Sequence, residues 1–269
     1  VGLSFGVHIL SLLVIPSVVF IYIYKRYPEL DLKQFILANI VSILVLAFVF
    51  KFLFPYTLVF FSASELFFIN TIGLPFNTGT IIAGIVLLGL FYYGLRLTRK
   101  KKLYTANLLI LCVIFIMIGF SSWLMLPIRA NANTTINEND PSSARELLAY
   151  YNREQYGDAN VFYGDYYSQT GERDKANPNR DAKPKYEKDE KAGKYVIVNN
   201  YKDALPNYSS KHKGIIPRMV DPTPSVVQNY KAIAGIPQRS KRKPTFGENL
   251  TFMVKYQFGY MYGRYFMWN

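Results

Sequence analysis

Four long apolar runs constrain the fold of this chain more than any other feature. They cover roughly residues 3–24, 34–54, 79–95 and 103–126. A helix needs about 20 apolar residues to cross the hydrocarbon core of a bilayer. Backbone groups in lipid must be hydrogen-bonded within the segment, which favours helices, and the runs lack the alternation of barrel strands. We therefore expect a mainly α, polytopic helical membrane protein with about four spans in this sequence.

The basic residues predict which ends of the spans face the cytoplasm. Lys25, Arg26 and Lys33 lie between the first and second runs, and Arg96 and residues 99–102 lie between the third and fourth. The linker 57–78 contains neither lysine nor arginine. Because short cytoplasmic loops are enriched in these residues, both basic connections are predicted to be cytoplasmic. The linker 57–78 and everything after Leu126 then face outward.

Polar residues in and near the spans have simple structural interpretations. The apolar linker 57–78 is predicted to lie along the outer interface or to dip back into the protein. Its one acid, Glu65, is a candidate site residue, and the favoured interpretation is a solvated glutamate on an interfacial helix. Lys51 is expected to snorkel to the interface. Asn39 and Asn107 are expected to bond neighbouring helices.

The outward half divides into two predicted regions after a transmembrane region 1–126. Residues 127–247 are expected to form a small α+β periplasmic lobe, and residues 248–269 an aromatic interfacial segment. Within the lobe, Asp140 is predicted to cap a helix over 141–156 that begins with Pro141. Short strands are predicted at 160–164, 194–200 and 214–220, and the charged stretch between the first two is expected to be a mobile loop or a hairpin with a solvated surface.

Composition and motifs exclude several function classes. The net charge is +13, but many of the charges flank apolar spans, so nucleic-acid binding is rejected. One cysteine, Cys112, and two histidines, His8 and His212, give neither a disulfide nor a metal-binding pattern. No nucleotide-binding or hydrolase motif is present. Because the sequence begins at Val1, we interpret it as an internal piece of a longer protein.

Two segments of the outward half contain candidate substrate contacts. The first follows the last span in "RANANTTINEND", where Arg129 would hold a phosphate and the carboxamides would meet sugar hydroxyls. The alternative is that asparagines mark turns, because they tolerate unusual backbone angles. The second group is the aromatic C-terminal end, where Arg264 would bind phosphate or stack on a ring, although aromatic residues also collect at membrane boundaries. The candidate substrate-binding residues are Arg129, Asn131, Asn133, Asn137, Glu138, Arg264, Tyr265 and Trp268.

Several motifs together resemble one family of membrane proteins. "PIRANANTTINENDP", "ARELLAYYNREQYGD", "FYGDYY", "IIPRM" and "GYMYGRYFMWN" look like a family of large multi-span proteins common in Bacteroidota, long catalogued as a domain of unknown function. Its animal relatives are transmembrane O-mannosyltransferases, and it resembles the C-type glycosyltransferases. The resemblance implies an inner-membrane protein with a periplasmic active site. It also implies that the catalytic acid lies in an outward loop before this sequence.

The resulting expectation is a glycosyltransferase that moves a sugar, possibly mannose, from a polyprenyl-phosphate donor to a hydroxyl of a periplasmic protein or glycan. Membrane lipids are the other expected partners. No cofactor or metal site is expected, and a divalent metal is left open. The alternatives are a non-enzymatic subunit or scaffold of an envelope complex, and a lipid-linked glycan transporter.

Overall fold

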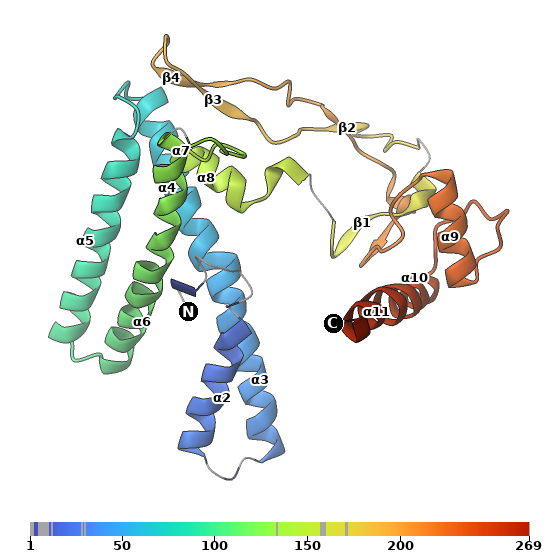
Figure 1. Cartoon of the computed structure of the whole chain (residues 1–269), viewed down its shortest axis with the longest axis horizontal. Coiled ribbons are helices and arrows are strands. Elements are labelled where there is room, and N and C mark those ends of the chain that lie inside the picture. Colours follow the sequence, from blue (N-terminus) through green and yellow to red (C-terminus); the bar gives the residue numbers. More distant parts are fainter. Residues whose placement is uncertain are drawn as a thin grey trace. The chain divides into compact units, whose positions relative to one another are not determined.

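The computed structural model describes residues 3–4, 11, 13–27, 29, 31–132, 134–156, 160–169 and 172–268, and these residues are mainly helical. The chain divides into two compact units (Figure 1). Unit 1 comprises Val1–Gly157 and Tyr186–Val196, and unit 2 comprises Asp158–Lys185 and Ile197–Asn269. The boundaries predicted at residues 126 and 247 separate regions by their position relative to a membrane. They remain predictions.

Unit 1 is a set of helices with one β-hairpin. Its elements are α2 (Val14–Arg26), α3 (Leu32–Ala47), the π-helix η2 (Phe48–Leu53), α4 (Phe54–Asn70), α5 (Thr78–Lys100), α6 (Tyr104–Phe120), η3 (Ser121–Leu124), α7 (Met125–Asn131), α8 (Ala144–Tyr151), η4 (Glu154–Tyr156), β3 (Tyr186–Asp189) and β4 (Lys194–Ile197). The connections α2–α3 and α5–α6 lie at one end of the unit, and the connection α4–α5 lies at the opposite end (Figure 1).

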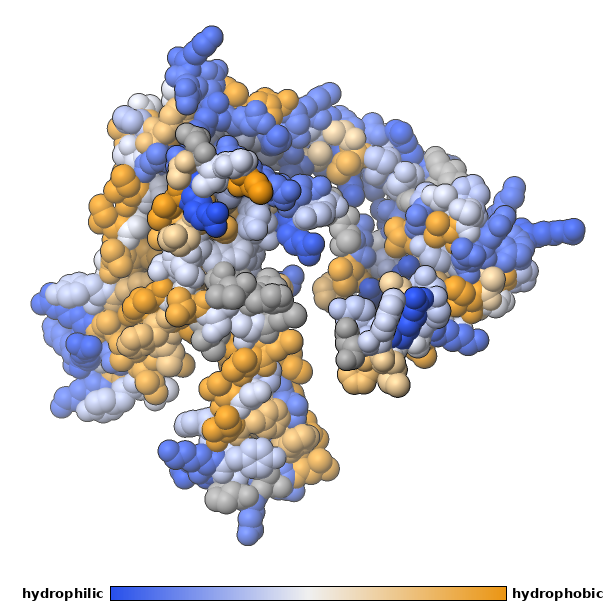
Figure 2. All heavy atoms as spheres, in the orientation of Figure 1, coloured by the Kyte–Doolittle hydropathy of each residue, from blue (hydrophilic) through white to orange (hydrophobic). Residues whose placement is uncertain are grey.

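Three helices in the described part of the chain are long and apolar enough to cross a membrane. They are Leu32–Asn70, with 39 residues, Thr78–Lys100, with 23, and Tyr104–Asn131, with 28. The second, third and fourth predicted spans lie within them. Their apolar side chains are largely exposed, and such side chains cover much of the visible surface of these helices (Figure 2). These features are compatible with a multi-pass membrane protein.

The first predicted span, 3–24, is not shown. Much of its N-terminal half lies outside the described residues, and the helix α2 that the structure describes has 13 residues. His8 also lies outside the described residues.

The predicted linker 57–78 is largely helical, because α4 continues directly from α3 through η2. Pro55 lies inside this continuous run, directly after the π-helical turn of η2, which adjusts the helix where Pro55 has no N–H to donate. The helix ends at Asn70, and the chain turns back through Gly73 and Asn77, whose φ angles of 82° and 69° suit glycine and asparagine. Close packing of α4 on α5 needs Gly79, because a Cβ there would lie 2.5 Å from the Cα of Glu65.

The two asparagines in the apolar helices, Asn39 and Asn107, differ in their partners. Asn107 donates to Thr98 Oγ1 at 2.8 Å and to the Leu95 carbonyl at 3.3 Å, so it joins α6 to α5 as predicted. Asn39 instead donates to the Phe35 carbonyl of its own helix at 2.9 Å. The prediction for Asn39 was therefore wrong, because the preceding turn of α3 already supplies an acceptor.

Helix α8 is shorter than predicted and has a different cap. Its N-cap is Ser143, whose side chain accepts a hydrogen bond from the Glu146 N–H. Asp140 has a φ of 32°, so it does not take the extended conformation of an N-cap, and Pro141 lies before the helix. Leu147 and Leu148 of α8 are buried and join the core of unit 1. The fully buried members of this core are Ile15, Val49, Phe54, Leu58, Phe120, Leu147 and Leu148.

Unit 2 combines short strand pairs with helices. Its elements are β1 (Tyr163–Asp165), η5 (Tyr167–Gln169), β2 (Asn179–Arg180), β5 (Leu205–Pro206), η6 (Ser210–His212), β6 (Lys213–Ile215), α9 (Pro224–Ala234), α10 (Phe246–Phe252), the π-helix η7 (Met253–Gly263) and α11 (Arg264–Trp268). Strand β1 pairs antiparallel with β6, and β2 with β5.

The strand predictions are partly confirmed. The predicted strands overlap β1, β4 and β6, but each observed strand has only three or four residues. The charged stretch predicted as a mobile loop or hairpin supplies β2 and β3, and β3 pairs with β4. Of the two forms predicted for this stretch, a mobile loop or a hairpin, the structure contains the hairpin.

The helical run α10–η7–α11 is anchored to unit 2 at its first turns. Thr245 and Glu248 form a capping box, in which each side chain bonds the backbone N–H of the other residue. The buried Asn249 accepts a hydrogen bond from the Arg218 N–H at 3.0 Å and donates to the Ile216 carbonyl at 2.8 Å. Phe252 packs into the core of unit 2 with Tyr167 and Met219. The aromatic C-terminal segment is thus a continuous helical extension from this core.

Candidate functional site

The exit from the last apolar helix carries Arg129 and a loop rich in asparagine. Helix α7 places Arg129 in its last turn, where the side chain is exposed. Asn131 donates to the carbonyls of Pro127 at 2.7 Å and Ser142 at 2.8 Å. Asn137 donates to Asp140 Oδ1 at 2.8 Å and to the Ala130 carbonyl at 3.3 Å. The amide groups of these asparagines therefore close the loop onto α7.

The charged residues of this loop have different surroundings from the asparagines. Arg129 and Glu138 are exposed, and neither has a hydrogen bond or ion pair with another described residue. Asn139 has a φ of 62°, as expected of an asparagine in a turn. Asn133 lies outside the described residues. Of the predicted contacts in unit 1, Arg129 is the exposed cation available to an anionic group.

The second predicted group belongs to unit 2 and lies in α11. The Arg264 guanidinium lies over the rings of Tyr260 at 5.5 Å and Trp268 at 5.4 Å, and its Nη1 donates to the Tyr260 hydroxyl at 2.8 Å. These residues are four positions apart on a helical run, so their side chains meet on one face. Of the two roles considered for Arg264, the structure describes ring stacking. Tyr265 and Trp268 are exposed beside it.

Glu65 is buried, which corrects its interpretation as a solvated residue. Its side chain is 0% exposed and accepts hydrogen bonds at the first turn of α5. Oε1 accepts from the Asn77 N–H at 2.7 Å, and Oε2 accepts from the N–H and hydroxyl of Thr80, both at 2.8 Å. A carboxylate at a helix N-terminus satisfies unpaired N–H groups and interacts favourably with the helix dipole. Glu65 therefore fastens α5 to α4.

The β3–β4 hairpin completes the burial of Glu65. Asn70 donates to the Tyr195 carbonyl and accepts from the Tyr195 N–H, both at 2.9 Å. The Tyr195 ring packs edge-on against Phe76, and its hydroxyl lies 3.5 Å from Glu65 Oε1. Burial raises the pKa of the Tyr195 hydroxyl, so it stays protonated as a donor at neutral pH. This cluster is a structural joint within unit 1.

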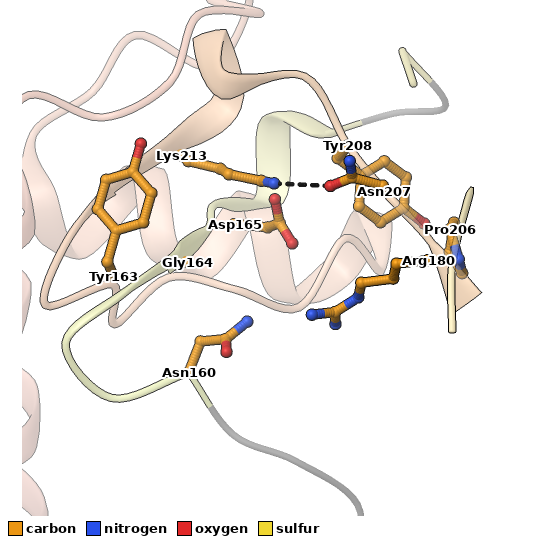
Figure 3. Close-up of a pocket in the computed structure, with 9 residues that line it drawn as sticks. All are labelled: Asn160, Tyr163, Gly164, Asp165, Arg180, Pro206, Asn207, Tyr208 and Lys213. Carbon is orange, nitrogen blue, oxygen red and sulfur yellow. Dashed lines mark hydrogen bonds between the residues drawn. The ribbon is translucent and has the colours of Figure 1, made fainter. Parts of the chain in front are cut away.

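Unit 2 contains a polar cavity of about 190 Å³ near the strand pairs β1–β6 and β2–β5 (Figure 3). Asp165, Lys213, Arg180 and Asn160 extend toward a common space, with Tyr163 and Tyr208 on either side (Figure 3). Gly164 brings Asn160 close, because a Cβ on Gly164 would lie 2.4 Å from the Asn160 Cβ. The remaining lining residues are Pro206 and Asn207.

The charges in this cavity are not paired with one another. Asp165 and Lys213 are direct partners in the antiparallel register of β1 and β6, but the Lys213 ammonium donates to Asn207 Oδ1 at 3.0 Å. Among the described residues, neither Asp165 nor Arg180 forms a salt bridge. Asp165 Oδ1 is buried without a hydrogen-bond donor. A buried oxygen in this state is rare in folded proteins and calls for an explanation.

A neighbouring hydrogen-bonded chain joins Ser168, His212 and Glu172. The His212 ring nitrogens lie 3.1 Å from Ser168 Oγ and 3.1 Å from Glu172 Oε2, and Lys211 lies 3.3 Å from Glu172 Oε1. The hydrogen bonds from His212 and Lys211 lower the pKa of the Glu172 carboxyl. Ser168 is 3% exposed, so a substrate has no approach to its hydroxyl. The chain therefore stabilises the turn before β6 and does not form a nucleophile.

The comparisons with known proteins assign no activity. The profile of a family described as "Family of unknown function (DUF8416)" matches residues 157–254, which is less than half of the chain. All the residues that line the cavity in Figure 3 lie within the matched range. None of the curated proteins and none of the solved structures matches this chain significantly.

The sequence analysis missed both the Glu65 joint and the cavity of unit 2. The partners of Glu65 include Tyr195, 130 residues away in the chain, and no local pattern indicates such a contact. The cavity residues occur as single polar positions in four short strands and their connections. The only signal was the motif "FYGDYY", whose Gly164 and Asp165 lie in β1. Among the described residues, no three His, Cys, Asp or Glu side chains are grouped to hold a metal ion.

Proposed function

We propose that this chain is part of a membrane glycosyltransferase that moves a sugar from a polyprenyl-phosphate carrier to a hydroxyl of a protein or glycan. In this proposal the protein lies in a bacterial inner membrane, with about four spans in this sequence and residues 127–269 in the periplasm. The position of Arg129 carries the proposal. The resemblance of the Arg129 loop and the C-terminal motif to the multi-span Bacteroidota family, which in turn resembles the C-type glycosyltransferases, supports it.

The length of the helix supports a position of Arg129 at the level of lipid phosphates. Helix Tyr104–Asn131 has 28 residues, and at about 1.5 Å per residue it is about 42 Å long. The hydrocarbon core is about 30 Å thick. When Tyr104 lies at one edge of the core, the last turn of the helix extends beyond the opposite edge into the headgroup region. Basic residues 99–102 before Tyr104 favour the cytoplasmic side for that end.

An exposed arginine at this level suits a lipid-linked phosphate. A guanidinium presents a planar set of donors that matches two phosphate oxygens, and it stays charged at physiological pH. In the proposed reaction the acceptor oxygen forms a bond to the anomeric carbon as the bond from that carbon to the phosphate oxygen breaks. Arg129 would stabilise the negative charge on the departing polyprenyl phosphate. A carboxylate outside this sequence would take the acceptor proton.

The other predicted residues have supporting roles in the proposal. Glu138 and the free carboxamide oxygens of Asn131 and Asn137 would orient sugar hydroxyls, and Asn133 belongs to the same loop. Arg264, Tyr265 and Trp268 would offer a second cation and aromatic surface in unit 2. The ring stacking of Arg264 leaves its outer face to water, because the side chain is exposed.

The test is Arg129→Ala in the protein expressed from its whole gene in a Gram-negative cell. We expect loss of sugar transfer from the lipid carrier to periplasmic acceptors, measured with a labelled sugar, while the amount of membrane-inserted protein stays unchanged. Arg129→Lys should keep part of the activity, because it keeps the charge. Arg239→Ala is the matched control, since Arg239 is also exposed and has no partner among the described residues.

Normal transfer by the inserted Arg129→Ala protein would contradict the proposal. Loss of a co-purifying envelope protein with transfer unchanged would instead support the docking subunit considered from the sequence.

A further inference from the structure

We propose that the cavity of unit 2 in Figure 3 binds one acidic monosaccharide unit, such as a uronic acid. The binding would not require the transfer reaction, because an enzyme and a docking subunit could both use it. The inference rests on the unpaired charges of the cavity, its buried acceptor oxygen and its size.

The buried acceptor indicates a ligand with hydroxyl groups. Asp165 Oδ1 has no donor in the described part of the chain, and the side chains that face it do not supply one. Rotation about the terminal bond of the Asp165 side chain, which lines the cavity, turns this unpaired oxygen toward a ligand donor, which would gain binding free energy without displacing a protein hydrogen bond. A sugar hydroxyl is a donor of suitable size, and it accepts at the same time from Asn160 or Arg180.

The cations indicate that the sugar is acidic. Lys213 and Arg180 face the cavity with one carboxylate, that of Asp165, so the lining carries a net positive charge (Figure 3). Arg180 has no described partner, and its guanidinium is free to bind a carboxylate through two parallel hydrogen bonds. A uronic acid presents this carboxylate on the same ring as its hydroxyls.

The size and walls of the cavity indicate a single ring. Its volume of about 190 Å³ is below the roughly 300–1,000 Å³ of sites for drug-sized ligands. Tyr163 and Tyr208 line opposite sides, and tyrosine offers an apolar face with a polar tip. One monosaccharide ring fits this combination better than an extended glycan or a lipid chain.

The experiment is ligand-detected NMR on the full chain in detergent micelles, with methyl glucuronide, methyl glucoside and inorganic phosphate as probes. We expect methyl glucuronide to bind at least tenfold more tightly than methyl glucoside. Arg180→Gln should remove this preference, and Asp165→Asn should weaken the binding of both sugars. The matched controls are Arg239→Gln and Asp203→Asn, whose side chains are exposed and outside the cavity.

Three results would overturn the inference. They are no sugar binding by the parent chain, equal affinity for the two sugars, and phosphate binding that displaces methyl glucuronide and is unaffected by Asp165→Asn. Thermal unfolding of each variant shows whether it is folded when binding is measured. Because the measurement needs no turnover, its failure leaves the transfer proposal intact, and a failed transfer test leaves this binding result intact.

Discussion

Glu65 receives two hydrogen bonds from Thr80, one from the backbone N–H and one from the hydroxyl, both at 2.8 Å. A third comes from the Asn77 N–H to the other carboxylate oxygen at 2.7 Å. The carboxylate thus replaces, for the first turn of α5, the acceptors that a preceding helical turn would supply. This joint fixes the α4–α5 connection and gives the hairpin β3–β4 a surface on which to dock.

Glu65→Gln should destabilise unit 1 although the two side chains have nearly the same shape. An amide has one acceptor oxygen, so in either orientation its NH₂ group faces a backbone N–H. One buried donor then stays unsatisfied, at a cost of about 1–3 kcal/mol. Thermal unfolding of the chain in detergent measures the loss. Glu190→Gln is the control, because Glu190 is exposed in the turn between β3 and β4 and should change the midpoint little.

Gly79→Ala should disrupt the same joint by a different route. The added methyl would lie 2.5 Å from the Glu65 Cα and from the Ser64 carbonyl oxygen, and both are backbone atoms that cannot rotate away. Overpacking of this kind costs about 1–3 kcal/mol or more. Gly89→Ala in the same helix is the matched control, since nothing lies within 4 Å of its added Cβ. The control should be neutral or slightly stabilising, because alanine favours helix.

An equal loss of stability in the Gly79 and Gly89 variants would show that helix propensity, and not the approach of α4, controls the effect. Protease cleavage near residues 71–77 distinguishes the two explanations. If α4 and α5 move apart, the connection between them becomes exposed to the protease.

These contacts show what the sequence could and could not predict. Runs of apolar residues predicted three helices that are long and apolar enough to cross a membrane, because lipid imposes length and helix on each segment independently of the others. The sequence could not predict the burial of Glu65, since its surroundings come from residues at 77–80 and 195. Local charge alone favours a solvated glutamate, whereas the close approach of α4 and α5 at Gly79, together with Tyr195 of the hairpin, buries it.

The candidate site could also be predicted only in part from the sequence. The loop after α7 was predicted from its composition, but whether Asn131 and Asn137 turn inward depends on carbonyl groups at Ser142 and Ala130. Arg264 was predicted to bind phosphate or to stack, and its i±4 spacing from Tyr260 and Trp268 was already visible in the sequence. The motif "FYGDYY" was the only local signal for the cavity of unit 2, because the cavity depends on the pairing of strands far apart in the chain.

Unit 2 should lose stability in acid through Glu248. Two hydrogen bonds from Arg242, at 2.6 and 2.8 Å, lower the pKa of the Glu248 carboxyl from 4.5 to about 2, and Thr245 contributes further hydrogen bonds. A depressed folded-state pKa gives stability that is present above the unfolded value and lost as pH falls. The loss therefore falls between pH 4.5 and about 2. We expect at most about 1 kcal/mol, because Arg242 is half exposed and water screens the pair.

The measurement is hydrogen exchange of residues 242–252 at about pH 6 and about pH 3, after correction for the intrinsic pH dependence of exchange. Glu248→Gln should be less protected at the higher pH and show little further loss at the lower one. If the parent and variant lose protection equally in acid, another group controls the transition.

The single cysteine gives a direct test of the proposed membrane orientation. Cys112 lies in α6, and Cys112→Ser removes the cysteine of this sequence before one reporter is introduced, with the protein lacking the reporter as the labelling control. Thr135 and Lys101 are exposed residues after α7 and in the basic connection between α5 and α6. A membrane-impermeant maleimide should modify Thr135→Cys in intact spheroplasts, and it should modify Lys101→Cys only after the membrane is opened. Basic residues 99–102 favour this result, because lysine and arginine are enriched in cytoplasmic loops. The reverse labelling pattern would move Arg129 to the cytoplasmic leaflet, and a periplasmic transfer reaction could then not use it.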